Sequence, residues 1–166
     1  AENPDHDIFI ESCLGALLYL VTNTRPDIAL PIGLLCRAMA KPTPALFEEV
    51  YCVLCYLREY PDLGLTYNGR GESAADDELH AFSDADWSTR RSTSGWLVRL
   101  WGATLDWRGQ QQPTVSLSSC QAEIMSASEA TKDVEQYRRL QEEVDALPDG
   151  SPRPPTKLYV DNQAAI

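Results

Sequence analysis

Lysine and arginine are scarce in this sequence, which has 14 of them against 25 aspartates and glutamates in 166 residues. The net charge of −11 is spread along the chain, and no segment forms a basic arm. Tight, autonomous binding of nucleic acid is therefore disfavoured, because it depends on lysine and arginine contacts with phosphates. The hydrophobic fraction of 43% is nevertheless that of a globular protein, and the chain is long enough to bury a core.

Hydrophobic runs long enough for a membrane span are also absent. The longest run is Cys13–Val21, whereas a membrane-spanning helix needs roughly 20 apolar residues. The N-terminal stretch AENPDHD is acidic and has no signal-peptide character. We therefore expect neither a membrane span nor a secretory leader.

The five cysteines lack the paired spacing of a disulfide framework, and their number is odd. They indicate reduced thiols in an intracellular, reducing compartment, cytoplasmic rather than secreted. Cys52 and Cys55 form a CVLC motif on a predicted helix, but no second pair of ligands accompanies it. We interpret both as packing residues rather than zinc ligands.

Residues 8–60 have the apolar periodicity of three helices separated by polar or proline-containing breaks. Thr24 and Thr43 are candidate N-caps of the second and third helices. The predicted apolar faces contain Ile10, Leu14, Leu17, Leu18 and Val21, then Ile28, Ile32, Leu35 and Met39, and finally Leu46, Val50, Val53, Leu54 and Leu57. We predict a helical segment over residues 1–60 and a glycine-containing connector over residues 61–78.

The second half of the chain predicts an α/β fold. Residues 79–87 alternate with the period of a strand, and residues 95–101 and 103–108 follow as a second and a third strand in an antiparallel meander. A helix over residues 119–147, capped by Ser118 or Ser119, leads to a last strand over residues 156–161. Because a helix separates the last strand from the meander, we expect that strand to lie parallel to the first.

Two of these strands end on an acid, Asp84 in the first and Asp161 in the last, and Glu123 lies near the start of the helix between them. If the two strands are neighbours, the three carboxylates meet at one rim of the sheet. Repulsion should then raise the pKa of at least one of them, and bound divalent metal best explains the cluster. Two Mg²⁺ ions about 3.5–4 Å apart would activate water against a phosphodiester. Spacing alone leaves a solvated acidic loop as the alternative.

Seven motifs, in this order, carry a resemblance to a known family: LGALLYLVTNTRPDIA (14–29), KPT (41–43), SDADW (83–87), TRRSTSGW (89–96), the DW-x-x-x-Q-x-x-x-V-x-LSS run (106–119), AE (122–123) and YVDNQAAI (159–166). In sequence, order and separation they resemble the Pol polyprotein of copia-type LTR retrotransposons. The resemblance implies that residues 1–60 correspond to the tail of the reverse transcriptase. It also implies that residues 79–166 form an RNase H-like domain, incomplete at its C-terminal end, with a truncated mixed sheet.

The resemblance also implies a site and a substrate. Asp84, Glu123 and Asp161 match carboxylates that bind Mg²⁺ or Mn²⁺ and catalyse hydrolysis of the RNA strand of an RNA–DNA hybrid. Asp86 matches a family residue without an assigned role, and we interpret it as a solvated turn acid. The stretch Arg90–Thr93 matches a polar signature for which we favour shaping of the turn, with contact to a phosphate as the alternative.

The chain departs from the family pattern at three points. Gln121 replaces an acid two positions before Glu123, the usually basic stretch is mostly neutral over residues 108–112, and the family's fourth carboxylate, from a later helix, has no counterpart. We therefore expect weak or no nuclease activity from the isolated chain. The alternative is a non-enzymatic, retroelement-derived structural or interaction subunit of a larger assembly, with protein partners covering the incomplete sheet.

Overall fold

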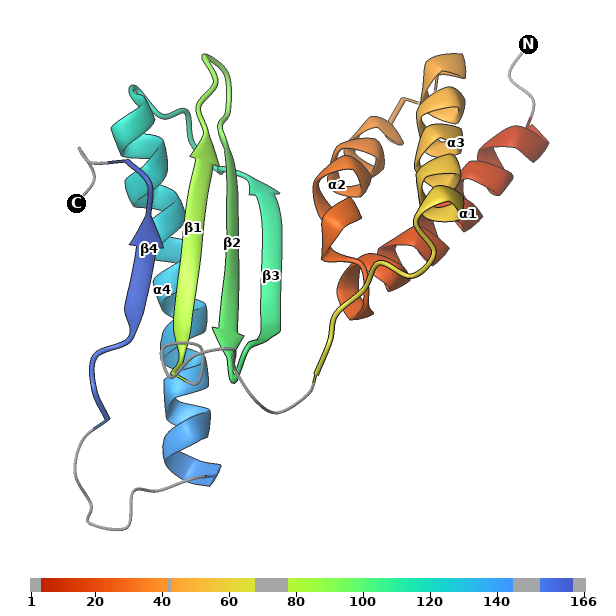
Figure 1. Cartoon of the computed structure of the whole chain (residues 1–166). Coiled ribbons are helices and arrows are strands. Elements are labelled where there is room, and N and C mark those ends of the chain that lie inside the picture. Colours follow the sequence, from red (N-terminus) through yellow and green to blue (C-terminus); the bar gives the residue numbers. More distant parts are fainter. Residues whose placement is uncertain (1–3, 42, 68–77, 145–152, 163–166) are drawn as a thin grey trace. The chain divides into compact units, whose positions relative to one another are not determined.

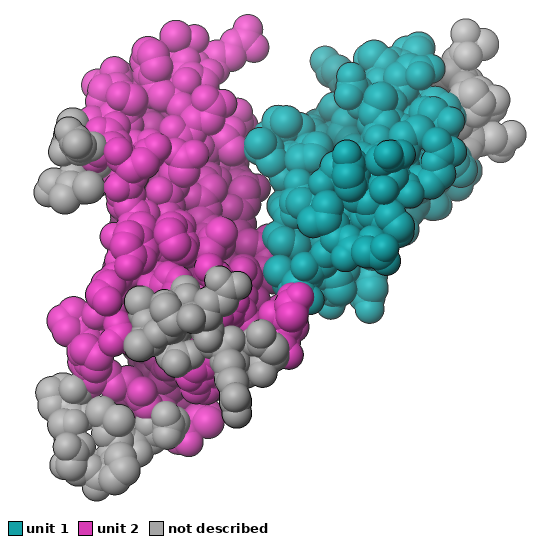
Figure 2. Space-filling view, viewed as in Figure 1, with its two compact units in different colours: residues 1–65 teal, residues 66–166 magenta. Residues whose placement is uncertain are grey.

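The computed structural model describes residues 4–41, 43–67, 78–144 and 153–162, with side chains from Ile8 onward (Figure 1). The chain divides into two compact units, Ala1–Leu65 and Thr66–Ile166 (Figure 2). The predicted connector spans this division, and its residues 68–77 lie outside the described part. None of the described helices is long and apolar enough to cross a membrane.

The first unit is helical. It contains α1 (Pro4–Asn23), the 3₁₀ turn η1 (Pro26–Ile28), α2 (Ala29–Ala38) and α3 (Pro44–Glu59). Residues three or four apart on each helix share a face, and the buried ones form a single core: Ile10, Leu14, Leu17, Ile28, Ile32, Leu35, Leu46, Val50 and Val53. All nine were predicted to be core residues from their periodicity.

Some predicted core residues lie outside this core. Leu18 is 41% exposed and Leu54 is 37% exposed, because each sits one position round the helix from a residue that is buried, Leu17 and Val53. Cys52 is also exposed, so its interpretation as a packing residue is wrong.

The two predicted caps have different outcomes. Thr43 occupies the N-cap position of α3, although its side chain makes no capping hydrogen bond. The prediction for Thr24 is wrong. Its main-chain N–H donates to Leu20 O at 2.9 Å, so Thr24 directly follows α1 at its C-terminal end, and Arg25 takes the N-cap position of η1.

A buried arginine joins the helices of the first unit. Arg25 is 6% exposed, and its guanidinium donates to both carboxylate oxygens of Asp27 and to Tyr60 O at 3.0 Å. Tyr56 donates its hydroxyl proton to Asp27 at 3.0 Å, and the Arg25 guanidinium lies 5.7 Å from the centre of the Tyr56 ring. The hydrogen bond from Arg25 lowers the pKa of Asp27. This cluster fastens η1, which directly precedes α2, to the end of α3.

The second unit is a four-stranded mixed sheet with one helix. The strands are β1 (His80–Asp86), β2 (Thr93–Leu100), β3 (Ala103–Gln111) and β4 (Lys157–Val160), and the helix is α4 (Ser119–Val144). The order in the sheet is β3-β2-β1-β4, with β4 parallel to β1 and the other pairs antiparallel. This confirms the predicted α/β class, the meander and the parallel last strand.

The predicted boundaries hold to within a few residues. β3 runs to Gln111 rather than residue 108, because Gln110 and Gln111 pair with the start of β2. The predicted end of α4, residue 147, lies outside the described residues. The β2–β3 turn has positive φ angles at both Trp101 (51°) and Gly102 (73°), the combination that a two-residue hairpin requires.

Small residues bring α4 close to one face of the sheet. Ala122, Ser126, Ala130 and Val134 are buried and follow one another at every fourth position, so they form a single column along the helix. They lie over Ala81 and Val98, which are fully buried on β1 and β2. Figure 1 shows that this packing brings the start of α4 to the end of the sheet where β1 and β4 terminate.

Candidate metal and nuclease site

Asp84 and Asp161 lie side by side because β1 and β4 run parallel in register. Ser83 pairs with Val160, so the next residue on each strand is an aspartate, and both aspartates are exposed. Glu123 approaches from α4 and is 5% exposed. One oxygen from each of these three carboxylates lies within 4.8 Å of the other two. The structure thus brings together all three of the predicted site residues.

The start of α4 is held by a reciprocal cap. The N–H of Gln121 donates to the Ser118 hydroxyl at 3.1 Å, and the side-chain oxygen of Gln121 accepts the N–H of Leu117 at 2.7 Å. Glutamine and glutamate both serve in such a capping arrangement. The departure from the family at Gln121 therefore falls on a residue that caps the helix and lies outside the carboxylate cluster.

Two further polar side chains fix α4 to the sheet beside the carboxylates. The Ser126 hydroxyl lies 2.8 Å from Asp84 O and 3.3 Å from Gly95 O. Gln112, 2% exposed, donates its amide to Ala122 O at 2.8 Å and to the Ser94 hydroxyl at 2.9 Å. Sequence reasoning missed Gln112, since a glutamine in a polar stretch carries no signal of burial.

We predict that Gln112→Leu loosens the start of α4. The change removes the Gln112 side chain as hydrogen-bond partner of the buried Ser94 and Ser116 hydroxyls and of Ala122 O, which costs about 1–3 kcal/mol of unfolding free energy. Hydrogen exchange should accelerate at the amides of residues 119–124 and stay unchanged near residue 134. Gln111→Ala, at the exposed neighbouring position, is the control. Equal exchange in the two variants would contradict the role of Gln112.

The pKa of Glu123 is raised above its ordinary value of 4.5. Burial is the largest cause, and repulsion by Asp84 and, more weakly, Asp161 adds to it, whereas the N–H of Ala85 acts in the opposite direction. The expected direction is confirmed, with burial rather than repulsion as the leading cause. Glu123 Oε2 is buried and has no hydrogen-bond partner within the described residues. A buried carboxylate oxygen without a partner is an unfavourable arrangement unless a cation binds it.

The three carboxylates fit a divalent cation in chemistry and in spacing. Mg²⁺ binds oxygen ligands at about 2.0–2.1 Å, so two oxygens on one ion are at most about 4.2 Å apart. Three oxygens spread evenly around one ion are at most about 3.6 Å apart, so oxygens that lie within 4.8 Å of one another need to close by up to about 1.2 Å for one ion to contact all three. Asp84, Glu123 and Asp161 are the only residues of the described part that form such a group.

The other predicted residues lie beyond this group. Asp86 ends β1 opposite Thr93 and is exposed. Ser92 is fully buried, and its hydroxyl accepts the N–H of Ser88 at 3.3 Å. Arg90 and Arg91 are exposed in the turn between β1 and β2.

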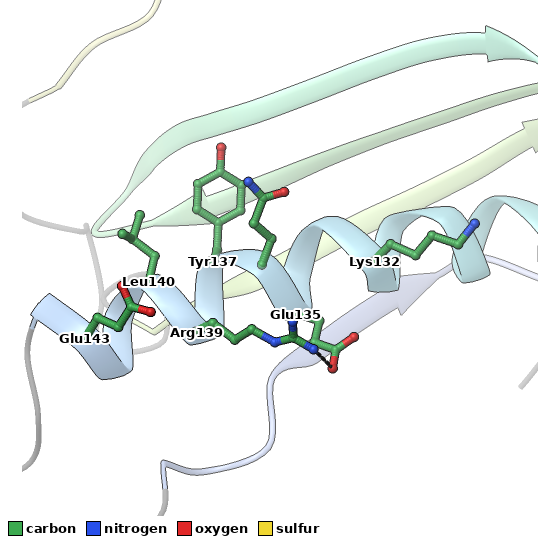
Figure 3. Close-up of a pocket in the computed structure, with 7 residues that line it drawn as sticks. Lys132, Glu135, Tyr137, Arg139, Leu140 and Glu143 are labelled. Carbon is green, nitrogen blue, oxygen red and sulfur yellow. Dashed lines mark hydrogen bonds and ion pairs between the residues drawn. The ribbon is translucent and has the colours of Figure 1, made fainter.

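A shallow pocket lies elsewhere in this unit, along the second half of α4 (Figure 3). Its lining includes Lys132, Tyr137 and Leu140, together with Arg139, which pairs with Glu135 at 2.9 Å. Most of its charged side chains come from the solvent side of one helix, and none of the three clustered carboxylates takes part. We assign no chemistry to it.

No protein-family model matches the chain, and no solved structure matches it significantly. The chain is 40% identical to secreted RxLR effector protein 161 of Plasmopara viticola over 126 residues, which are 74% of the chain and 86% of that protein. It is 31% identical over 93% of its length to the retrovirus-related Pol polyprotein from transposon TNT 1-94 of Nicotiana tabacum. It is also 31% identical over 92% of its length to that from transposon RE1 of Arabidopsis thaliana.

The polyprotein relatives define a class, the retrovirus-related proteins of transposons. The chain belongs to the Pol polyprotein family of copia-type LTR retrotransposons. This confirms the resemblance drawn from the motifs. The chain spans only 11% and 10% of the length of the two polyproteins, so their activities as whole proteins are a matter of proposal for this chain.

Proposed function

We propose that residues 79–166 form an RNase H-like nuclease module, which hydrolyses the RNA strand of an RNA–DNA hybrid with Mg²⁺ or Mn²⁺. The convergence of Asp84, Glu123 and Asp161 carries the proposal. The buried, unpartnered oxygen of Glu123 supports it independently. Membership of a Pol polyprotein family supports the choice of substrate.

Each carboxylate has a separate part in the proposed reaction. Glu123, buried against the sheet, would hold the cation from the side of α4, while the exposed Asp84 and Asp161 would hold it from the strand ends. When bound there, a divalent ion would supply a water of lowered pKa as the nucleophile and would stabilise the leaving oxygen. Two of the three carboxylates, those of Asp84 and Asp161, are exposed. The proposed site is therefore accessible from solvent.

The test is incubation of the purified chain, in excess, with an RNA–DNA hybrid labelled on the RNA strand. We expect slow cleavage of the RNA strand with Mg²⁺ or Mn²⁺ and none with EDTA. The reaction should be slow because only three carboxylates of the described part group together, and a second ion then has fewer protein ligands. Complete absence of cleavage with either ion over long incubation would contradict the proposal.

A second candidate is a non-enzymatic interaction subunit, and one observation favours it. Phe82 and Tyr159 alternate with residues buried under α4, so they lie on the opposite face of the sheet. Their rings stack with centres 4.9 Å apart, and they are 39% and 45% exposed. Because the two rings are contiguous, they form a small apolar patch, and contiguous exposed apolar patches are a feature of protein contact surfaces. We propose that a protein partner, such as a second copy of the chain, covers this face.

We predict that the isolated chain self-associates through this aromatic pair. Tyr159→Lys should shift the sedimentation profile of a concentrated sample towards the monomer, because it places a charge in the contact. Leu117→Lys changes a residue that is 86% exposed and far from the pair in sequence, and it should leave association unaltered. A wild-type chain that remains monomeric at high concentration would contradict this second candidate.

We also propose an intracellular, reducing location, cytoplasmic rather than secreted. All five cysteines lie in the described part of the chain, and none of them forms a disulfide. Thiols in this state are typical of a reducing compartment.

A further inference from the structure

The turn between β1 and β2 stands at the same end of the sheet as the three carboxylates (Figure 1). It begins after Asp86, and Arg90 is four residues further along the chain, a span of at most roughly 14 Å. Both Arg90 and Arg91 are exposed there. A ligand bound at the carboxylates and extending along this end of the sheet therefore passes within reach of two guanidinium groups.

These two arginines differ from every other cationic side chain described in the second unit. Four of the others pair with a carboxylate: Arg108, Lys132, Arg139 and Lys157. Three donate to main-chain carbonyls: Arg99, Arg138 and Arg153. Among the cationic side chains that the structure describes in the second unit, only Arg90 and Arg91 have no acceptor for their guanidinium groups. The chain has a net charge of −11, so two adjacent cationic side chains without a carboxylate partner form a local site of positive charge.

The shape of the turn does not depend on the arginine side chains. The Ser92 hydroxyl accepts the N–H of Ser88, and the Ser88 hydroxyl accepts the N–H of Arg90, both at 3.3 Å. Ser92 O accepts the N–H of Gln112 at 2.8 Å, and the Trp87 indole donates to Ser116 O at 3.1 Å. Other side chains and the main chain thus fix the turn, so the structural role expected for the arginines is filled by their neighbours.

We propose that Arg90 and Arg91 form a phosphate clamp, which binds the sugar–phosphate backbone of the nucleic acid whose scissile bond lies at Asp84, Glu123 and Asp161. Guanidinium groups bind phosphate oxygens through paired hydrogen bonds. A turn already fixed by hydrogen bonds presents them with little ordering cost on binding. The clamp supplies attraction where the carboxylates repel phosphate, and it rests on the proposed nuclease function.

The test measures binding separately from cleavage. Fluorescence anisotropy with a labelled RNA–DNA hybrid in EDTA gives the affinity of the full chain without turnover. We expect the double change R90A/R91A to lower affinity at least tenfold. The slope of log K against log[salt] should become less steep by about 1.8, since each phosphate contact contributes roughly 0.9. R90K/R91K keeps both charges and should keep most of the slope.

Controls separate the clamp from general charge and from the nuclease proposal. R139A removes one exposed arginine that is paired with Glu135, and it should bind like the wild type. If R90A/R91A also binds like the wild type, or if the wild type does not bind the hybrid, the clamp is refuted. If binding depends on the two arginines but Mg²⁺ and Mn²⁺ give no cleavage, the clamp stands and the nuclease proposal fails. If the wild type and R90A/R91A cleave the hybrid at equal rates and bind it with equal affinities, the clamp is refuted and the nuclease proposal stands.

Discussion

Asp84→Asn should reduce metal-dependent cleavage of an RNA–DNA hybrid to less than roughly one-hundredth of the wild-type rate. Loss of a residue that only supports a metal ligand already costs about 10–100-fold, so loss of a ligand itself should cost at least the upper figure. Glu123→Gln should have the same effect, because it removes the buried charge of the cluster. The measurement is single-turnover cleavage with Mn²⁺, and cleavage that persists in Asp84→Asn would contradict this assignment of the site.

Both variants should fold, and Glu123→Gln should be more stable than the wild type at pH 7. A carboxyl whose pKa is raised in the folded state binds protons more tightly there than in the unfolded chain. Its ionisation therefore lowers stability as pH rises above the unfolded value of 4.5. Glutamine avoids that loss, so the difference between variant and wild type should vanish below pH 4.5. Urea unfolding of both proteins at pH 7 and below pH 4.5, without metal, provides the measurement.

Arg25→Ala should destabilise the first unit by about 2–4 kcal/mol. Breaking a buried ion pair costs about 3–5 kcal/mol, and partial solvation reduces that cost, since the Asp27 side chain remains 25% exposed. The change also removes the donor to Tyr60 O. Arg37→Ala removes an exposed arginine of α2 and is the matched control. Equal unfolding free energies for the two variants would refute a stabilising role for the cluster.

The four tryptophans make it possible to assign the destabilisation by Arg25→Ala to one of the two units. All of them, at positions 87, 96, 101 and 107, belong to the second unit. In Arg25→Ala, loss of helical circular dichroism should move to lower urea concentration while the tryptophan fluorescence transition stays in place. Because Arg25 lowers the pKa of Asp27, the wild type should also lose stability as pH falls below 3.8. The variant should lose this dependence.

Local pattern was sufficient to predict the strands, and it placed the three carboxylates at one rim of the sheet, although spacing alone left a solvated acidic loop as the alternative. Alternation marks β1, and a helix between the meander and the last strand leaves few arrangements other than a parallel pair. Given that pair, Asp84 and Asp161 follow at equivalent positions. The capping residues of α4 are equally local, because Ser118 and Gln121 satisfy the helix start within one turn.

Contacts between distant residues were beyond prediction. Arg25 is an ordinary charged residue in the sequence, and only the fold places it against Tyr60, 35 positions away. In the sequence Gln112 is typical of a polar surface residue, yet its side-chain amide donates a hydrogen bond to Ala122 O beneath α4. Leu17 and Leu18 are adjacent and chemically identical, and the neighbouring helices decide which of them is buried. Each of these outcomes depends on packing partners that periodicity does not reveal.

The column of small residues on α4 has a consequence for the choice of ion. Ala122, Ser126 and Ala130 set the gap between helix and sheet, and Glu123 follows the first of them. That gap therefore fixes how far the Glu123 carboxylate stands from the strand ends. Ca²⁺ takes ligands at about 2.3–2.6 Å and Mg²⁺ at about 2.0–2.1 Å, so a few tenths of an ångström separate a fitting ion from a poor one. At the proposed metal site, the packing of α4 against the sheet would therefore favour ions of one radius over another.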